Sequence, residues 1–225
     1  MGIIDVFFPR KCFGCGKEGQ YLCPLCFSEI RKPSPICPGC ERLSIDGKTH
    51  KICKRTLGLD GLFSLWFYGG AMRKAIISLK YKFALDVAKE ISKKAVLGLK
   101  EVNLPKITVL ASIPSQKRRE NWRGFNQAEE IGKLIARQMR WEFVPGLLVK
   151  RGATVPQTQL SRDERRKNVE GVFSLNPVYK KLISGTKLFL FDDVWTTGST
   201  IKEAAKTLKI NGAKEVWALT LVRGR

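Results

Sequence analysis

The stretch Leu190-Phe-Asp192-Asp193-Val-Trp-Thr196-Thr197-Gly198-Ser199-Thr200 decides the fold, because it joins two different patterns. The apolar run 187–191 predicts a buried strand, and the spacing of apolar residues over 200–210 predicts a helix that Asn211-Gly212 would close. Small hydroxyl side chains and a glycine allow the backbone amides at a helix N-terminus to surround a phosphate, and the helix dipole favours its charge. We therefore predict a phosphate-binding loop formed by Thr196, Thr197, Gly198, Ser199 and Thr200.

Two adjacent acids, Asp192 and Asp193, stand directly before this loop. Carboxylates at that place lie one sugar-length from the phosphate and can accept hydrogen bonds from vicinal ribose hydroxyls. An ordinary capped turn would account for the loop, but it would leave two acids at the end of an apolar strand unexplained. The pair therefore extends the predicted ligand from a phosphate to a ribose 5-phosphate.

Strand and helix patterns alternate on the N-terminal side of this loop and continue after it. The predicted strands are 62–68, 107–113, a weaker one at 142–149, and 215–222, and the predicted helices are 72–83, 85–99 and 126–139. Residues 151–178 are polar and basic and would form an excursion from the sheet. Alternation of this kind predicts an open, doubly wound α/β domain with a parallel sheet and helices on both faces. Ligands of such domains bind beyond the carboxyl ends of the strands.

All seven cysteines and the single histidine lie in the first quarter of the chain, as four pairs with the same two-residue spacing. That spacing lets two ligands of a tight turn reach one Zn²⁺, so eight ligands suit two ions. Disulfides fit poorly, because the number of cysteines is odd and nothing marks the chain as secreted. Sequential and interleaved pairings both satisfy the spacing. The predicted ligands are Cys12, Cys15, Cys23, Cys26, Cys37, Cys40, His50 and Cys53.

Both sites would be filled by protein ligands, which makes them structural rather than catalytic. After Cys53 the pattern changes to regular secondary structure, so we expect two domains, a zinc-binding module at 1–57 and an α/β domain at 58–225. No stretch approaches the roughly 18 consecutive apolar residues of a membrane span, and the N-terminus lacks the pattern of a signal peptide. We therefore expect a cytoplasmic protein without a transmembrane segment.

The formal net charge of +21, from 41 basic and 20 acidic residues, is the most unusual feature of the composition. It suggests a polyanionic partner such as nucleic acid or an acidic membrane face, although a Lys-rich solvated surface would also produce it. Two basic clusters, 117–123 with Trp122 and 162–167, suit single-stranded DNA, whose phosphates meet cations while its bases stack. Alternatively these residues bind only pyrophosphate or face solvent, and Trp122 packs against the following helix.

The run 191–200 resembles the diphosphoribosyl-binding signature of type I phosphoribosyltransferases. Three further features narrow the match: Arg123-Gly-Phe-Asn-Gln127, then Gln157-Thr-Gln-Leu-Ser161 followed by Arg165 and Asn168, and the four N-terminal Cys/His pairs. Together they resemble the ComF family, whose best known members are competence proteins of natural transformation. The resemblance covers nearly the whole chain. His50 departs from the usual cysteine of the family but keeps a zinc ligand.

The resemblance implies a phosphoribosyltransferase-like domain behind a double zinc ribbon. Asp192 and Asp193 would be the catalytic acids that hold the ribose hydroxyls, with Mg²⁺ and 5-phosphoribosyl 1-diphosphate (PRPP) or a related sugar phosphate as ligand. The implied partners are single-stranded DNA and DNA-uptake machinery such as a helicase. The residues expected to meet pyrophosphate or nucleic acid are Ser115, Lys117, Arg118, Arg119, Arg123 and Arg165.

At Thr196 the chain differs from many enzymes of the superfamily in a way that bears on catalysis. Many purine enzymes of the superfamily carry an acid at the place of Thr196, where it accepts a proton from the base, and a threonine cannot do this. Two functions therefore remain open. The first is a protein that binds a phosphoribosyl ligand and handles DNA during transformation, and the second is an active phosphoribosyltransferase with an unidentified nitrogenous acceptor.

Overall fold

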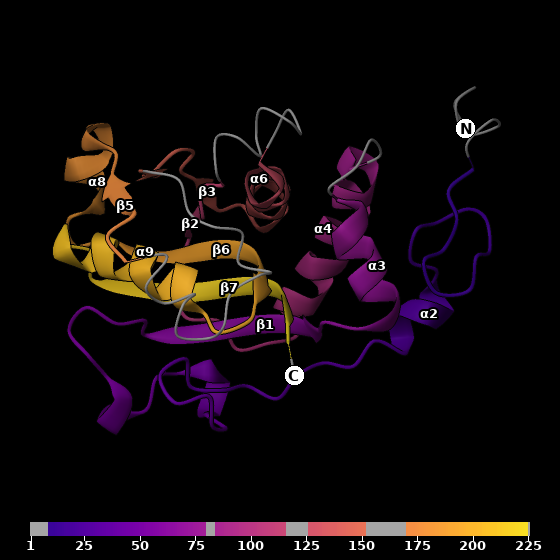
Figure 1. Cartoon of the computed structure of the whole chain (residues 1–225), viewed down its shortest axis with the longest axis horizontal. Helices are drawn as coiled ribbons and strands as arrows, with labels where there is room; N and C mark the ends of the chain where they lie inside the picture. Colours follow the sequence, from indigo (N-terminus) through magenta and orange to yellow (C-terminus); the bar gives the residue numbers. More distant parts are fainter. Residues whose placement is uncertain (1–8, 80–83, 116–125, 152–169, 225) are drawn as a thin grey trace.

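The computed structural model of the chain describes residues 9–79, 84–115, 126–151 and 170–224. A five-stranded sheet forms its centre, and every neighbouring pair of strands in it is parallel. Figure 1 shows β1, β7 and β6 one above another, with α9 in front of them and α3, α4 and α6 above. In spatial order the strands are β1 (Gly61–Phe67), β7 (Glu215–Arg223), β6 (Lys187–Trp195), β2 (Val109–Ser112) and β3 (Glu142–Phe143). The predicted parallel sheet is confirmed.

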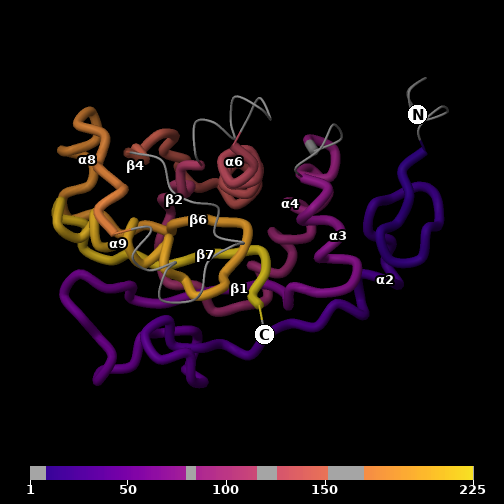
Figure 2. The backbone as a smooth tube through the Cα atoms, in the orientation of Figure 1, coloured from indigo at the N-terminus to yellow at the C-terminus, as the bar shows by residue number. Residues whose placement is uncertain are grey.

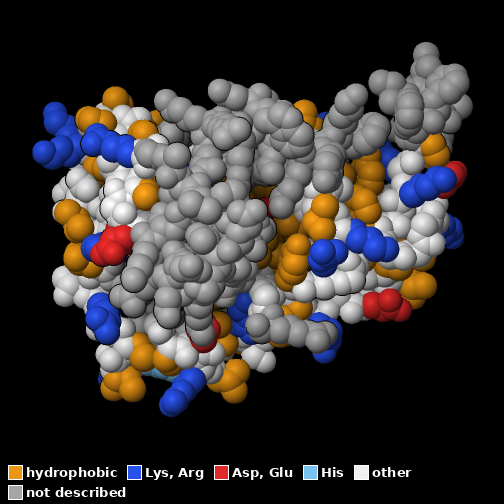
Figure 3. All heavy atoms as spheres, in the orientation of Figure 1, with side chains coloured by type: hydrophobic (Ala, Val, Ile, Leu, Met, Phe, Trp, Pro, Cys, Tyr) orange, Lys and Arg blue, Asp and Glu red, His pale blue; other side chains and the backbone are white. Residues whose placement is uncertain are grey.

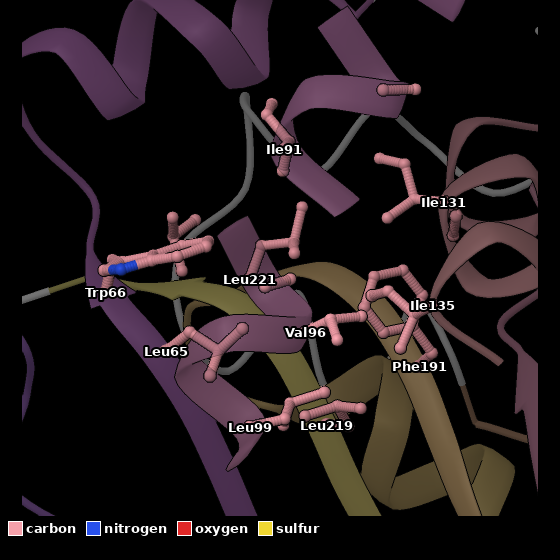
Figure 4. Close-up of a cluster of buried hydrophobic side chains, with 14 of the residues drawn as sticks. Leu65, Trp66, Ile91, Val96, Leu99, Ile131, Ile135, Phe191, Leu219 and Leu221 are labelled. Carbon is pink, nitrogen blue, oxygen red and sulfur yellow. The ribbon is translucent and has the colours of Figure 1, made fainter. Parts of the chain in front are cut away.

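Alternate residues of β6 enter two separate hydrophobic clusters, which places helices on both faces of the sheet. Phe189 and Phe191 pack with α3 (Gly70–Ser78), α4 (Ala84–Lys100) and α6 (Gln127–Met139). Figure 4 shows this face, where side chains of α4 and α6 converge on Phe191. Leu188 and Leu190 pack instead with α9 (Ser199–Ile210). An apolar run that is buried on both faces is typical of a central parallel strand.

The predicted strand at 142–149 divides into two. Its first residues form β3 in the main sheet, and β4 (Leu148–Lys150) pairs antiparallel with β5 (Phe173–Leu175) in a separate two-stranded sheet. Pro145-Gly146 separates the two strands, and Gly146 has a φ of 61°, which interrupts an extended chain. A 3-10 turn η4 (Pro177–Tyr179) and a short helix α8 (Lys180–Ile183) follow β5 before the chain enters β6.

The cysteine-rich segment lies along β1, the strand at one edge of the sheet (Figure 2). We call residues 10–30 ribbon 1, which contains α2 (Pro24–Ser28), and residues 36–57 ribbon 2, which contains the 3-10 turns η1 (Ile45–Gly47) and η2 (Lys51–Cys53). Lys48 forms an antiparallel bridge with Gly61 at the start of β1. The Phe67 N–H at the end of β1 donates to the carbonyl of Arg31 at 3.0 Å. The segment thus ties both ends of an edge that would otherwise offer unpaired backbone groups.

Ribbon 1 reaches further and packs against α4. Leu22 is fully buried in the cluster between the sheet and α4. The backbone N–H groups of Tyr21 and Leu22 donate to the two carboxylate oxygens of Glu90 at 3.0 and 2.7 Å. The ring of Phe27 meets Trp66 of β1 edge-on, with 5.6 Å between ring centroids. No helix in the described part of the chain is long and apolar enough to cross a membrane.

Candidate functional site

Two carboxylates stand at the carboxyl end of the central strand β6. β6 extends four residues beyond its predicted end, because Val194 and Trp195 continue to pair with β7, so Asp192 and Asp193 lie within the strand. Both are half-buried, and the backbone N–H of Asp193 donates to Asp192 Oδ1 at 2.9 Å. Burial and the adjacent Asp193 carboxylate raise the pKa of Asp192 well above its usual range. A bound cation or hydroxyl donor would relieve this repulsion.

The loop that follows leads into the N-terminus of α9 and is tightly packed. Thr197 Oγ1 and Ser199 Oγ are 2.8 Å apart, and the Ser199 N–H donates to Thr197 Oγ1 at 3.4 Å. Gly198 has a φ of 68° and immediately precedes α9. A Cβ at Gly198 would lie 2.2 Å from the ring of Trp195, which is itself buried beneath the loop. The first amides of α9 point out of the helix without intrahelical carbonyl partners, as at any helix N-terminus.

Lys150 and Lys202 lie beside this edge, and neither was predicted from the sequence. Lys202 Nζ donates to the Thr197 carbonyl at 3.1 Å and lies 5.1 Å from the ring centroid of Trp195. A lysine in the first turn of a helix opposes the helix dipole, and this was an available signal for a nearby anion. The charge of Lys150, on β4, lowers the pKa of Asp192 against the larger effect of burial. Its position depends on the β4–β5 pairing, which the sequence pattern did not predict.

The end of β2 forms the neighbouring part of the same edge. Ser115 follows β2 and is half-buried. The Asn126 side chain joins this loop to α6, since its Nδ2 donates to the Ile113 carbonyl and its Oδ1 accepts from the Ala128 N–H, both at 3.1 Å. Gln127 Nε2 donates to the carbonyl of Leu79 at 2.9 Å. The other residues predicted to meet pyrophosphate or nucleic acid lie outside the described residues: Lys117, Arg118, Arg119, Arg123 and Arg165.

The first ligand cluster consists of Cys12, Cys15, Cys23 and Cys26, whose sulfurs all lie within 4.8 Å of one another. Cys15 Sγ and Cys23 Sγ are 3.8 Å apart. Four sulfurs with Zn–S bonds of about 2.3 Å would be separated by about 3.8 Å along each edge of the tetrahedron. The donor set and the spacing therefore fit a structural zinc ion.

The charges of this cluster favour a metal as well. Burial raises the pKa of the Cys12 thiol, but backbone N–H groups of Cys15, Cys23 and Gly14 outweigh it and lower the pKa to about 6. Burial and hydrogen bonds with neighbouring sulfurs then raise the pKa of Cys26 to about 12. The thiolate of Cys12 is therefore stabilised, whereas deprotonation of Cys26 is disfavoured. A dication that binds all four sulfurs removes that opposition.

The second cluster consists of Cys37, Cys40, His50 and Cys53, with its ligand atoms again within 4.8 Å. His50 Nε2 donates to the carbonyl of Leu43 at 2.9 Å, and Nδ1 faces Cys40 Sγ at 3.4 Å. The hydrogen bond fixes the tautomer in which Nδ1 is the metal donor, an arrangement common among zinc-binding histidines. Sulfur hydrogen bonds, led by that with Cys40, and burial raise the pKa of Cys53 to about 11.

The two ribbons repeat one structure. Lys11 bridges to Glu18 in ribbon 1 as Ile36 bridges to Leu43 in ribbon 2. The N–H of Cys23 donates to Cys12 Sγ, and the N–H of His50 donates to Cys37 Sγ, both at 3.4 Å. His50 therefore takes the place of Cys23 in the second ribbon. The ligands group sequentially along the chain, which resolves the choice that the spacing alone left open.

Comparison with known proteins agrees with this description. The model of the double zinc ribbon domain family matches residues 3–57. "Competence protein F" of Haemophilus influenzae is 28% identical over 221 residues, 92% of this chain and 89% of that protein. "Competence protein ComFC" of Bacillus subtilis is 27% identical, over 92% of this chain and 86% of that protein. "DNA utilization protein YhgH" of Escherichia coli K12 is 27% identical, over 88% and 89%.

Solved structures with a distant likeness include glutamine PRPP amidotransferase from B. subtilis, with 18% identity and a TM-score of 0.40. The match covers 60% of this chain but only 27% of the amidotransferase. Adenine phosphoribosyltransferase from Leishmania donovani is 16% identical with a TM-score of 0.30, and the match covers 60% of this chain and 64% of that enzyme.

By fold, the chain is an α/β protein with an open parallel sheet and a double zinc ribbon at its N-terminal end. Over about nine tenths of its length, it is similar to the proteins named competence protein F, competence protein ComFC and DNA utilization protein YhgH.

Proposed function

We propose that the chain is a cytoplasmic ComF-type protein that binds a phosphoribosyl ligand of the PRPP type and handles single-stranded DNA in natural transformation. The observation that supports this most directly is the continuous arrangement of Asp192 and Asp193 with the Thr197–Ser199 loop at the carboxyl edge of the sheet. The competence proteins among its relatives support the cellular role.

The ligand would lie across this edge. The 5-phosphate would accept hydrogen bonds from the loop amides and hydroxyls of Thr196 to Thr200, and the ribose hydroxyls would donate to Asp192 and Asp193. Mg²⁺ would supply charge compensation for the diphosphate, and the mutually repelling carboxylates of the two aspartates suit a nearby cation. Ser115 would approach the pyrophosphate from the end of β2.

A role in DNA handling rests on the relatives and on the charge of +21. When basic side chains bind the phosphates of DNA, they displace counterions, so the affinity for an oligonucleotide should fall steeply as the salt concentration rises. The basic clusters 117–123 and 162–167 remain the proposed contacts. A helicase or another component of the uptake machinery is the proposed protein partner.

Calorimetric titration of the zinc-loaded protein with PRPP and Mg²⁺, beside titration with a single-stranded oligonucleotide, tests the proposal. Asp192→Ala and Asp193→Ala should each weaken PRPP binding by at least about tenfold, because each removes an acceptor of charge-assisted hydrogen bonds. The affinity for the oligonucleotide should stay unchanged. Asp86 is a partly exposed acid on α4, and Asp86→Ala is the matched control that should bind both ligands normally. Equal loss of both ligands in the site variants would refute separate sites.

A second candidate is an active phosphoribosyltransferase with an unidentified nitrogenous acceptor, and the complete run from Asp192 to Thr200 favours it. Thr196 is exposed and carries no carboxylate, so the acceptor would have to react without a general base from that position. Pyrophosphate release from PRPP and Mg²⁺, measured over a panel of nitrogenous bases and amines, distinguishes the candidates. Release that depends on one acceptor and disappears in Asp193→Ala supports the enzyme, and release at the uncatalysed rate throughout supports a binding protein.

A further inference from the structure

Ribbon 2 exposes aliphatic side chains to an unusual degree. Leu43, Ile45 and Ile52 are 71%, 81% and 95% exposed. Single exposed aliphatic residues are ordinary on protein surfaces, but these three belong to one small ribbon. The segments that carry them are adjacent, because the His50 ring donates to the Leu43 carbonyl at 2.9 Å and Ile52 lies between His50 and Cys53. We call these three side chains the ribbon 2 patch.

Ribbon 2 also carries exposed basic residues, two of them next to the patch in sequence: Arg42 precedes Leu43 and Lys51 precedes Ile52. Ribbon 2 contains five basic and two acidic residues. Figure 3 shows hydrophobic and basic side chains together along the lower edge of the molecule, where Figure 1 draws ribbon 2. Lys54 contacts Asp60 at 3.8 Å. All five basic residues are exposed: Arg42, Lys48, Lys51, Lys54 and Arg55.

Ribbon 1 shows that the zinc fold does not require this patch. The matching backbone bridges place Glu18 of ribbon 1 where ribbon 2 has Leu43. Two residues further along, ribbon 1 has Gln20 where ribbon 2 has Ile45. Ribbon 1 also uses its apolar side chains differently, since Leu22 is buried against the α/β domain. The same local structure therefore forms with polar residues at the places of Leu43 and Ile45, and these two aliphatic residues need another explanation. At the place of Ile52 ribbon 1 has Leu25, which is 71% exposed.

We propose that the ribbon 2 patch docks an acidic protein segment that presents aliphatic side chains, such as one face of an amphipathic helix. The patch would provide the apolar centre of the interface and the basic residues its charged rim. Complementary charge would favour an acidic partner and speed its association.

The patch is less suited to nucleic acid or to a membrane. Single-stranded nucleic acid binds where bases stack on aromatic rings, and ribbon 2 contains no Phe, Tyr or Trp. Membrane-surface binding commonly uses an amphipathic helix, and the regular elements within ribbon 2 are two three-residue 3-10 turns.

Ribbon 2 contacts the amino end of the edge strand, whereas the proposed phosphoribosyl site lies at the carboxyl edge of the sheet. Ribbon 2 contacts the start of β1, where Lys48 bridges to Gly61 and the Thr49 N–H donates to the Asp60 carbonyl at 2.9 Å. Asp192 and Asp193 lie near the carboxyl end of the parallel strand β6. A protein held at ribbon 2 would leave the carboxyl edge open, so this inference does not depend on the proposed function.

A displayed library of helical peptides tests the proposal with the zinc-loaded full chain. Peptides selected on the wild type should be counter-selected on the double variant Leu43→Glu/Ile45→Gln, which carries the residues of ribbon 1. We expect enriched peptides to be acidic, with aliphatic residues three and four positions apart. Synthetic copies should bind the double variant at least about tenfold more weakly than the wild type, and should bind the wild type more weakly in high salt.

Control measurements keep the result unambiguous. The double variant should retain its zinc content and its PRPP titration, and Val178→Gln, which changes a residue 81% exposed on η4, should bind the peptides normally. Failure to enrich peptides that distinguish wild type from variant, or enrichment of peptides without acidic residues, would overturn the proposal. The proposal would also be overturned if the wild type formed a dimer that the double variant does not form. The same holds if the wild type bound oligodeoxythymidylate or phosphatidylserine vesicles and the double variant did not.

Discussion

At the scale of single residues, Gly198 is the position on which the phosphate loop depends most directly. Its φ of 68° and the 2.2 Å approach of a built Cβ to the Trp195 ring both exclude a side chain. Gly198→Ala should cost more than about 2 kcal/mol of stability, from left-handed strain and from displacement of a buried ring, and should abolish PRPP binding. Urea unfolding and calorimetry measure the two effects.

Gly185→Ala separates the two causes. Gly185 has a φ of 74°, but a Cβ there meets nothing within 4 Å, so this variant introduces the strain without the overlap. It should cost about 1 kcal/mol and leave ligand binding intact. If both variants lost the same stability, the contact with Trp195 would not be what shapes the loop.

At the scale of elements, sequence patterns correctly predicted the structures that depend on neighbouring residues in the chain. The strand–loop–helix around Asp192 and the Cys/His pairs follow from neighbouring residues, and their elements are present. The extension of β6 to Trp195 depends on pairing with β7, and the division of 142–149 depends on where β5 returns. Lys150 acts electrostatically on Asp192, and its position on β4 depends on the pairing with β5. The roles of residues in the site remain predictions until ligand binding is measured.

The contact between ribbon 1 and α4 should be worth measurable stability. Glu90 accepts two backbone hydrogen bonds from ribbon 1, and hydrogen bonds to a charged group contribute roughly 1.5–3 kcal/mol each. Glu90→Ala should destabilise the chain by about 2 kcal/mol or more and speed zinc loss to a chelator from ribbon 1, since two partly buried N–H groups lose their acceptor. Asp86→Asn, which removes a partly exposed ion pair and the acid of the first turn of the same helix, should change stability by about 1 kcal/mol or less. Similar losses in the two variants would contradict this role of Glu90.

At the scale of the whole molecule, the zinc ribbons cover the edge of the sheet as well as forming their own small structures. The sequence predicted the metal ligands but not this placement, because the contacts join residues far apart in the chain. Arg31 meets the end of β1 and Lys48 meets its beginning. Ile36 of ribbon 2 is buried with residues of α9 and the sheet in one cluster. Metal binding in ribbon 2 should therefore stabilise the edge strand of the α/β domain.

His50→Ala tests this coupling. Loss of one ligand should reduce the bound zinc from two ions to one, loosen ribbon 2 and free the outer edge of β1, which offers unpaired backbone groups to another chain. We expect faster hydrogen exchange in β1 and concentration-dependent association in light scattering. His50→Cys is the matched control, because ribbon 1 has Cys23 at the same place, and it should bind two zinc ions and stay dispersed. If His50→Ala lost one zinc ion yet kept β1 protected, the edge would be held by the polypeptide contacts alone, and the metal would stabilise only ribbon 2.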